Sequence, residues 1–308
     1  MSALLVPASL RRWGGSLRSL GPLVLHVDKD VVVVFKPATI LMQGDARKDD
    51  VTVTDNLLDA VKAHVDGPAF LVHRLDRPTS GLCVFARSAR AAAALSQGFR
   101  ERRVSKDYLA VVNGRLAPTA TAGSAAGAGE LCLTDWLGVG QGGTEVWADG
   151  SSSSSASSGG RSVEARLRVQ TVATFTADKA APAAAPPAAP FQTQSKSQSQ
   201  SQSQSQSQSQ SQSQAQQQTL VRVRLETGRK HQIRAQLAHA GHPVVGDARY
   251  GAPQRFQLRD IALHSFRLAF QHPSSKQPLV FRAGVPSSWA ARFGPAVASA
   301  ADALVAGS

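Results

Sequence analysis

The chain has 308 residues, of which 42% are hydrophobic, and a formal net charge of +13. This length suffices for one large domain or two small ones with a sizeable core, and the excess of positive charge favours a polyanionic partner, nucleic acid first. Only two cysteines are present, Cys83 and Cys132, which argues against a disulfide framework and a four-cysteine zinc site. No apolar run approaches the about 20 residues that cross a bilayer, so we expect a soluble protein with no membrane partner.

The first residues have the composition of an organelle transit peptide. No acidic residue precedes Asp28, and Arg11, Arg12 and Arg18 alternate with serines and leucines. We therefore expect a disordered or transit-peptide-like segment over 1–22 and import into a mitochondrion or chloroplast. The alternative is a cytoplasmic protein whose chain simply starts with a disordered stretch or a helix on the domain.

Helical and strand patterns alternate in the first third of the chain. Turn residues at 28–30 separate two short apolar runs, and Leu57, Leu58, Val61 and Val65 share one helical face behind a cap at Thr54 or Asp55. In chain order the patterns predict two strands over 23–35, a helix over 55–65, a strand over 82–86, a helix from Ser88 to about Arg103, and a strand over 106–112.

Three low-complexity tracts interrupt the chain. Residues 117–129 and 148–160 are rich in Ala, Gly and Ser, and residues 177–218 are rich in Ala and Pro and then repeat Ser-Gln. These compositions cannot bury a core, so we expect disordered insertions.

The third tract separates two strand-like runs, 163–175 and 219–226, that both alternate arginines with apolar residues. Such runs would pair as a hairpin, and a long loop between them costs little because closure entropy grows only logarithmically with length. We therefore expect one domain over 23–282, followed by an Ala-rich tail over 283–308.

The segment His73-Arg74-Leu75-Asp76-Arg77-Pro78-Thr79-Ser80-Gly81 places Asp76 in a loop between two predicted strands. A loop on a rigid scaffold is a suitable place for a reactive group. Alone, an Asp two residues before Pro is more simply a turn or cap residue.

A second polar segment, Thr227-Gly228-Arg229-Lys230-His231-Gln232-Ile233-Arg234, ends a basic strand and opens an amphipathic helix. A helix start with cations around it is a plausible site for a phosphate or a carboxylate.

Together these two segments resemble the RluA-type pseudouridine synthases, a family that modifies uridines in ribosomal and transfer RNA. The stretch 106–114 is similar to the family's tyrosine strand, 241–251 to the turn after its arginine helix, and 262–265 with 272–273 to its C-terminal strand pair. The resemblance covers roughly residues 23–114, 130–139, 161–175 and 219–282, in the family's order.

The resemblance implies an α+β fold, the pseudouridine synthase fold, in which helices flank a curved, mainly antiparallel mixed sheet with a central RNA-binding cleft. It assigns Asp76 as the catalytic aspartate, Tyr108 as the tyrosine stacked on the target base, and Arg234 as the arginine paired with Asp76. The reaction is an isomerisation, so no cofactor and no metal is expected. The residues expected to bind RNA are Arg74, Arg229, Lys230, His73 and Thr79.

One residue departs from the family pattern: Thr39 follows Lys36, Pro37 and Ala38, where the family often has Gly, which puts the local loop geometry in question. A monomer acting on ribosomal or transfer RNA is expected. The competing hypothesis is a catalytically inactive RNA-binding or ribosome-assembly protein of the same fold. A metal hydrolase built on His231, His239 and His242 is disfavoured, because Gly241 and Pro243 break the helix that would align them.

Overall fold

The computed structural model describes residues 4–5, 20–44, 56–116, 130–140, 143–147, 162–176, 217–254, 256 and 260–307. The predicted insertions 117–129 and 148–160, and residues 177–216 of the third, lie outside these ranges. The elements, in chain order, are β1 (Leu4–Leu5), η2 (Gly21–Leu23), β2 (Val24–Val27), β3 (Val31–Lys36), α1 (Leu57–Val65), β4 (Phe70–Leu71), β5 (Ser80–Ala86), α2 (Ala89–Arg100), β6 (Ser105–Asn113), β7 (Glu130–Gly140), β8 (Gly143–Trp147), β9 (Val163–Thr176), β10 (Gln217–Leu225), α3 (Gln232–His239), η3 (Ala248–Tyr250), β11 (Leu263–Gln271), β12 (Pro278–Arg282), α4 (Ser287–Phe293) and α5 (Pro295–Gly307).

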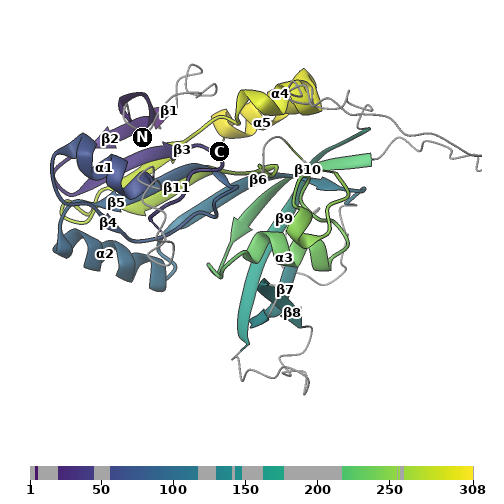
Figure 1. The fold of residues 1–308 in the computed structure, drawn as a ribbon, viewed down its shortest axis with the longest axis horizontal. Coiled ribbons are helices and arrows are strands. Elements are labelled where there is room, and N and C mark those ends of the chain that lie inside the picture. Colours follow the sequence, from purple (N-terminus) through teal and green to yellow (C-terminus); the bar gives the residue numbers. More distant parts are fainter. Residues whose placement is uncertain are drawn as a thin grey trace, which may run out of the picture.

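One sheet runs through the described residues, in the order β2-β3-β5-β11-β6-β10-β9-β7-β8, with β4 on β5 and β12 on β11. Its neighbours are antiparallel except for β5 with β11 and β1 with β12. Figure 1 shows α1 and α2 at one end of the sheet, α4 and α5 above it, and β7 to β9 bending away below. The predicted α+β fold with a mainly antiparallel mixed sheet is confirmed.

The central strands are apolar because both sides of them are covered. All residues of β3 and β5 are buried, and so are those of β6 from Asp107 onward. A strand that alternates its side chains between two covered faces reads as a continuous apolar run, as Val31–Phe35 does. The predicted strands over 23–35, 82–86 and 106–112 are therefore confirmed.

The two N-terminal helices begin at side-chain caps. Ser88 accepts a hydrogen bond from the Ala91 amide at 3.1 Å, which confirms the predicted start of α2. The predicted cap of α1 was wrong by one or two residues, since Asn56 accepts from the Asp59 amide at 3.1 Å. Asn is as good a cap as Asp, and sequence pattern alone does not separate adjacent candidates.

The hairpin predicted across the third tract is confirmed. β9 and β10 are antiparallel and Gln217 pairs with Thr176, so the strands meet directly at the ends of residues 177–216. The tract's predicted end at residue 218 was too late, because Gln217 and Gln218 already belong to β10.

The prediction of a C-terminal tail over 283–308 was wrong. Residues Ser287–Phe293 and Pro295–Gly307 form α4 and α5. Buried Val297, Ala301 and Val305 recur every fourth residue, so they lie on one side of α5 and pack into the core.

The N-terminal segment is described only in part. Leu4–Leu5 forms β1, which pairs with β12, and the chain continues from Leu20, while residues 1–3 and 6–19 lie outside the described residues. Within the described part of the chain, no helix combines the length and apolar character that a membrane span requires.

Candidate functional site

Asp76 lies in the loop between β4 and β5, and the backbone fixes that loop at the centre of the sheet. Asp76 O accepts from the Thr79 amide at 3.1 Å, which closes a turn just before β5. At the start of β5, Gly81 has φ +117°, and a Cβ there would lie 2.2 Å from Ser265 O of β11. Gly is therefore required where β5 and β11 approach each other.

Lys36, at the end of β3, holds the same loop through hydrogen bonds to its backbone. Its side chain is fully buried, and its Nζ donates to the carbonyl oxygens of Pro37, Arg77 and Thr79 at 2.9, 3.0 and 2.7 Å. Burial lowers the pKa of Lys36 to about 7, although acidic neighbours such as Asp76 and Asp260 oppose this shift. A buried amine thus organises the backbone on both sides of Pro78.

Asp76 and Arg234 form the ion pair that the resemblance implied. Arg234 Nη1, from α3, donates to Asp76 Oδ2 at 3.0 Å. The Asp76 side chain is 24% exposed and that of Arg234 is 6% exposed. The carboxylate is therefore held by a buried cation while one side of it remains open to a ligand.

Asp247 holds the other edge of the Arg234 guanidinium. It accepts from Arg234 Nε at 2.6 Å and from Nη2 at 2.9 Å, a two-bond pairing, and the Tyr250 ring lies 5.1 Å from the guanidinium carbon. Burial opposes the charged form, but the hydrogen bonds and charge of Asp247, followed by those of Asp76, outweigh it and raise the pKa of Arg234. Sequence reasoning missed Asp247 and Tyr250, although both lie in the 241–251 stretch that carried the resemblance.

His231 was also missed as a site residue. Its Nε2 lies 3.8 Å from Asp76 Oδ1, and its Nδ1 lies 2.9 Å from the Tyr250 hydroxyl. Burial lowers the pKa of His231; Asp76 opposes this shift, and the cations around it add to it. The His231 ring is therefore neutral at pH 7, so the charged partner of the Asp76 carboxylate is Arg234.

Tyr108, on β6, faces the same cavity as Asp76 and is 5% exposed. Burial, and then the charge of Asp76, raise the pKa of Tyr108 above its ordinary value. The phenol therefore keeps its proton at neutral pH, which suits a hydrogen-bond donor and a stacking surface and disfavours a general base.

These groups meet in one cavity, whose empty space, with its open mouth, is about 450 Å³. Leu225, Ile233 and Leu263 supply apolar side chains to its lining, while Val223 and Leu237 are buried in the core. The cavity is lined by Arg74, Leu75, Asp76, Thr79, Lys106, Tyr108, Leu225, Gly228, Arg229, His231, Gln232, Ile233, Arg234 and Leu263.

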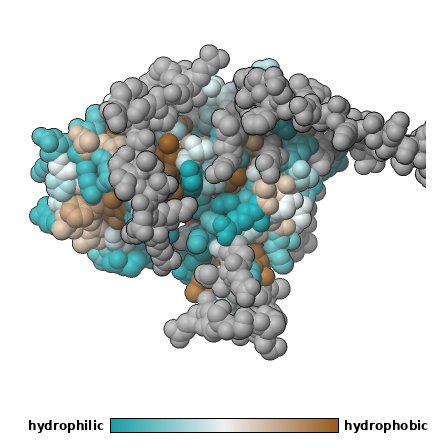
Figure 2. All heavy atoms as spheres, in the orientation of Figure 1, coloured by the Kyte–Doolittle hydropathy of each residue, from teal (hydrophilic) through white to brown (hydrophobic). Residues whose placement is uncertain are grey.

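Two of the predicted RNA-binding cations, Arg74 and Arg229, are exposed at this cavity. Lys230 is exposed but does not line it, and its carbonyl accepts from Thr144 Oγ1 at 3.0 Å. Figure 2 shows a face that is hydrophilic across its middle, where Figure 1 places β6 and β10.

The start of α3 differs from the predicted anion site. The Arg229 amide already donates to Gln232 Oε1 at 3.0 Å, and His231 at the cap has φ 53°. That backbone donor is therefore used within the protein.

His73, which was predicted to bind RNA, makes its contacts within the protein. The His73 side chain does not line the cavity; its Nε2 accepts from the Val84 amide at 3.0 Å and its ring stacks on Phe99 at 4.8 Å. Burial lowers the pKa of His73 to about 3, so the ring is neutral and structural. Thr79 does line the cavity, but it is 2% exposed, which leaves little of it for RNA.

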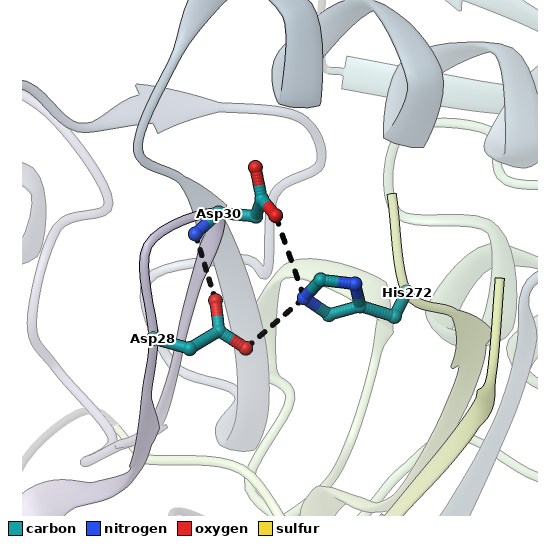
Figure 3. Close-up of side chains that lie close together, drawn as sticks. All are labelled: Asp28, Asp30 and His272. Carbon is teal, nitrogen blue, oxygen red and sulfur yellow. Dashed lines mark hydrogen bonds and ion pairs between the residues drawn. The ribbon is translucent and has the colours of Figure 1, made fainter. Parts of the chain in front are cut away.

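Among the described residues, Asp28, Asp30 and His272 lie close enough together to suggest a metal site (Figure 3). His272 Nε2 lies 3.1 Å from Asp28 Oδ2 and 3.7 Å from Asp30 Oδ2. However, His272 Nδ1 accepts from the amides of Ser274 and Ser275, which places the ring proton on Nε2, the atom that would have to bind the metal. The group instead ties the β2–β3 turn to the turn after β11.

Comparison with protein families gives a match over the same region. A family model described as RNA pseudouridylate synthase matches residues 30–239, which include Asp76, Tyr108 and Arg234. The tRNA pseudouridine synthase C of Salmonella typhi is 29% identical over 275 residues, covering 86% of each chain. The ribosomal large subunit pseudouridine synthase D of Vibrio parahaemolyticus is 26% identical over 282 residues, covering 87% of this chain and 68% of that protein.

Solved structures agree on the fold. Human RNA Pseudouridylate Synthase Domain Containing 1 aligns with a TM-score of 0.58 and 19% identity, covering 90% of this chain and 89% of that one. Human RNA Pseudouridylate Synthase Domain Containing 4 aligns with a TM-score of 0.57 and 21% identity, covering 93% and 95%. At these identities the likeness concerns the fold alone.

Proposed function

This chain belongs to the RNA pseudouridylate synthase family and isomerises uridine to pseudouridine in RNA, and we propose that Asp76 is its catalytic carboxylate. The observation that carries this proposal is the Asp76–Arg234 pair, in which Arg234 Nη1 lies 3.0 Å from Asp76 Oδ2, in a cavity that Tyr108 also lines. A protein that only binds RNA would not need a partly exposed carboxylate that is paired with a buried arginine.

The reaction breaks the bond from ribose C1′ to uracil N1 and forms a bond from C1′ to C5, with the C5 proton lost and N1 protonated. Reactants and product have the same composition, so the residues must supply position and charge. Arg234 orients the Asp76 carboxylate, and Asp247 holds Arg234 in place. The Asp76 carboxylate can then act as nucleophile or base on the ribose or the base.

The target uridine must leave its helix to enter the cavity, because Asp76 lies within the protein surface. Tyr108 offers a flat ring for the extruded uracil, with Leu225, Ile233 and Leu263 around it.

The substrate class is part of this proposal. The relatives above are named for tRNA and for the large ribosomal subunit, and a charge of +13 fits either RNA. We also propose that the protein is a monomer, since one chain supplies all the residues that line the cavity. We further propose import into an organelle, because no acidic residue precedes Asp28. Light scattering and imaging of a C-terminally tagged chain test these two points.

The test compares wild type with Asp76→Asn on unmodified total RNA, with pseudouridine mapped at nucleotide resolution by carbodiimide-dependent reverse-transcription stops. We expect sites with wild type and a loss of turnover on the order of 10³-fold or more in the variant, with RNA affinity kept. The matched control is Asp66→Asn, an exposed residue with φ 46° where Asn is well tolerated, and it should keep full activity. Equal modification by Asp76→Asn would refute the assignment.

A further inference from the structure

Lys106 is a cation in the cavity that the reaction described above does not use. It lies on β6 two residues before Tyr108, and both side chains line the same cavity. Side chains two apart on a strand share a face, so the register of β6 that presents Tyr108 to the base also presents Lys106 beside it.

The Lys106 ammonium has no anion to balance it. Within the part of the chain that the structure describes, no carboxylate lies within ion-pair distance of its Nζ, which lies 5.4 Å from the centroid of the Phe99 ring. Burial alone lowers the pKa of Lys106 to about 8. Arg234, in the same cavity, pairs with two carboxylates, whereas Lys106 pairs with none among the described residues.

The surroundings of Nζ show which partner fits. Arg74 and Arg229 line the same cavity, so an anion entering there would meet three cations. A Cβ at position 228 would lie 3.3 Å from Lys106 Nζ, and Gly228 therefore leaves the ammonium open on that side. A uracil carbonyl carries no net charge to balance a buried ammonium, whereas a phosphodiester carries a full one.

We propose that Lys106 binds a non-bridging phosphate oxygen of the nucleotide that enters the cavity. Arg74 and Arg229 assist at the mouth, where they are exposed to solvent. The phosphate contact fixes the ribose beside Asp76 while the base rests on Tyr108. This inference rests on the proposed function, because it takes the ligand to be an extruded RNA nucleotide.

The first test uses Lys106→Met and Lys106→Gln, with Lys29→Met as the control for loss of one exposed charge in the β2–β3 turn. We expect the two Lys106 variants to raise KM about tenfold or more with kcat nearly unchanged, and to lower the slope of log affinity against log salt by about 1. Both should fold, because they remove a partly buried charge that no carboxylate compensates. Lys29→Met should leave KM unchanged.

The second test identifies the atom. RNA carrying a neutral methylphosphonate on either side of the target uridine is titrated against wild type and Lys106→Met. At one of the two positions, the neutral linkage should weaken wild-type binding about tenfold and leave binding by the variant unchanged, so that the two changes are not additive.

Two results would overturn the proposal. A fall in kcat with constant KM would place Lys106 at the reacting base, and additive effects of the variant and the neutral linkage would separate Lys106 from the phosphate. The binding measurements need no turnover, so they are distinct from the test of the proposed function, which is whether wild type forms pseudouridine.

Discussion

Thr39 is held in a conformation that suits Gly. Its φ is +71°, which is strained for a β-branched residue, and its carbonyl accepts from Arg77 Nε at 2.9 Å. Arg77 directly follows Asp76, so the turn after β3 helps to fix the loop that carries the carboxylate. The position where the sequence departs from its family thus has a definite geometric reason to prefer Gly.

Thr39→Gly should therefore stabilise the protein. Relief of the left-handed backbone is worth about 1 kcal/mol, and the Arg77 contact uses only the Thr39 carbonyl, so turnover should persist. Urea unfolding measures the change. Thr39→Ala, which keeps a Cβ, is the matched control and should gain less. A less stable Thr39→Gly variant would mean that the Thr side chain makes a contact that outweighs the strain.

Lys36 should make stability depend on pH. Its pKa is about 7 in the folded chain and near 10.5 in the unfolded one, so between these values the unfolded chain binds more protons and stability rises with pH. Lys106 adds to the same trend, since burial also lowers its pKa.

Lys36→Met should show a smaller rise in unfolding free energy than wild type between pH 7 and pH 9, measured by urea titration at each pH. It should also lose turnover on the order of 10²-fold, because the carbonyls around Pro78 lose their common donor and the Asp76 loop shifts. Parallel pH profiles in the two proteins would show that Lys36 is protonated alike in folded and unfolded chains.

At the scale of elements, the β9–β10 hairpin makes residues 177–216 dispensable for the fold. Gln217 and Thr176 are already paired, so a short turn would join them. Replacing the tract by a four-residue turn should keep turnover and raise stability by roughly 2 kcal/mol through a smaller loop-closure entropy.

Chemical denaturation and the carbodiimide assay measure the two effects of this replacement. A same-length Gly-Ser segment is the control and should behave as wild type. Loss of turnover in the shortened chain alone would assign the tract a part in binding RNA.

Sequence patterns predicted elements well where one residue type dominated a face. The Val31–Phe35 run, the Ser88 cap and the Arg-alternating hairpin strands were identified correctly. The helix α5 was not predicted, because residues 283–308 were described only as an Ala-rich tail, although Val297, Ala301 and Val305 recur with a helical period. The spacing of the apolar residues indicates a helix here, whereas the high alanine content alone does not.

Part of the site could be predicted, and part could not. Asp76, Tyr108 and Arg234 came from motifs, whereas the role of Asp247 depends on a contact with Arg234 made across a turn. His73 was predicted to bind RNA together with Arg74, but its ring stacks on Phe99 and does not line the cavity. Neighbours in a loop point in different directions, and local sequence does not say which one reaches the cavity.

At the scale of the whole molecule, the order of the strands was beyond local reasoning. Along the chain, β5 and β6 are consecutive strands separated by α2. In the sheet, β11 lies between them, parallel to β5 and antiparallel to β6. Helical and strand periods alone give only a mixed α and β protein. The family resemblance supplied the architecture, since it carries information about pairings between distant segments.

The late position of β11 in the chain also bears on biosynthesis. About 150 residues separate the end of β6 from the start of β11, which at ribosomal speed is roughly 8–30 s of translation. During that interval β5 and β6 lack the strand that pairs with both of them. Unpaired strand edges favour aggregation between nascent chains. The two edges that meet β11 in the finished protein are thus the places where a chaperone would protect the growing chain.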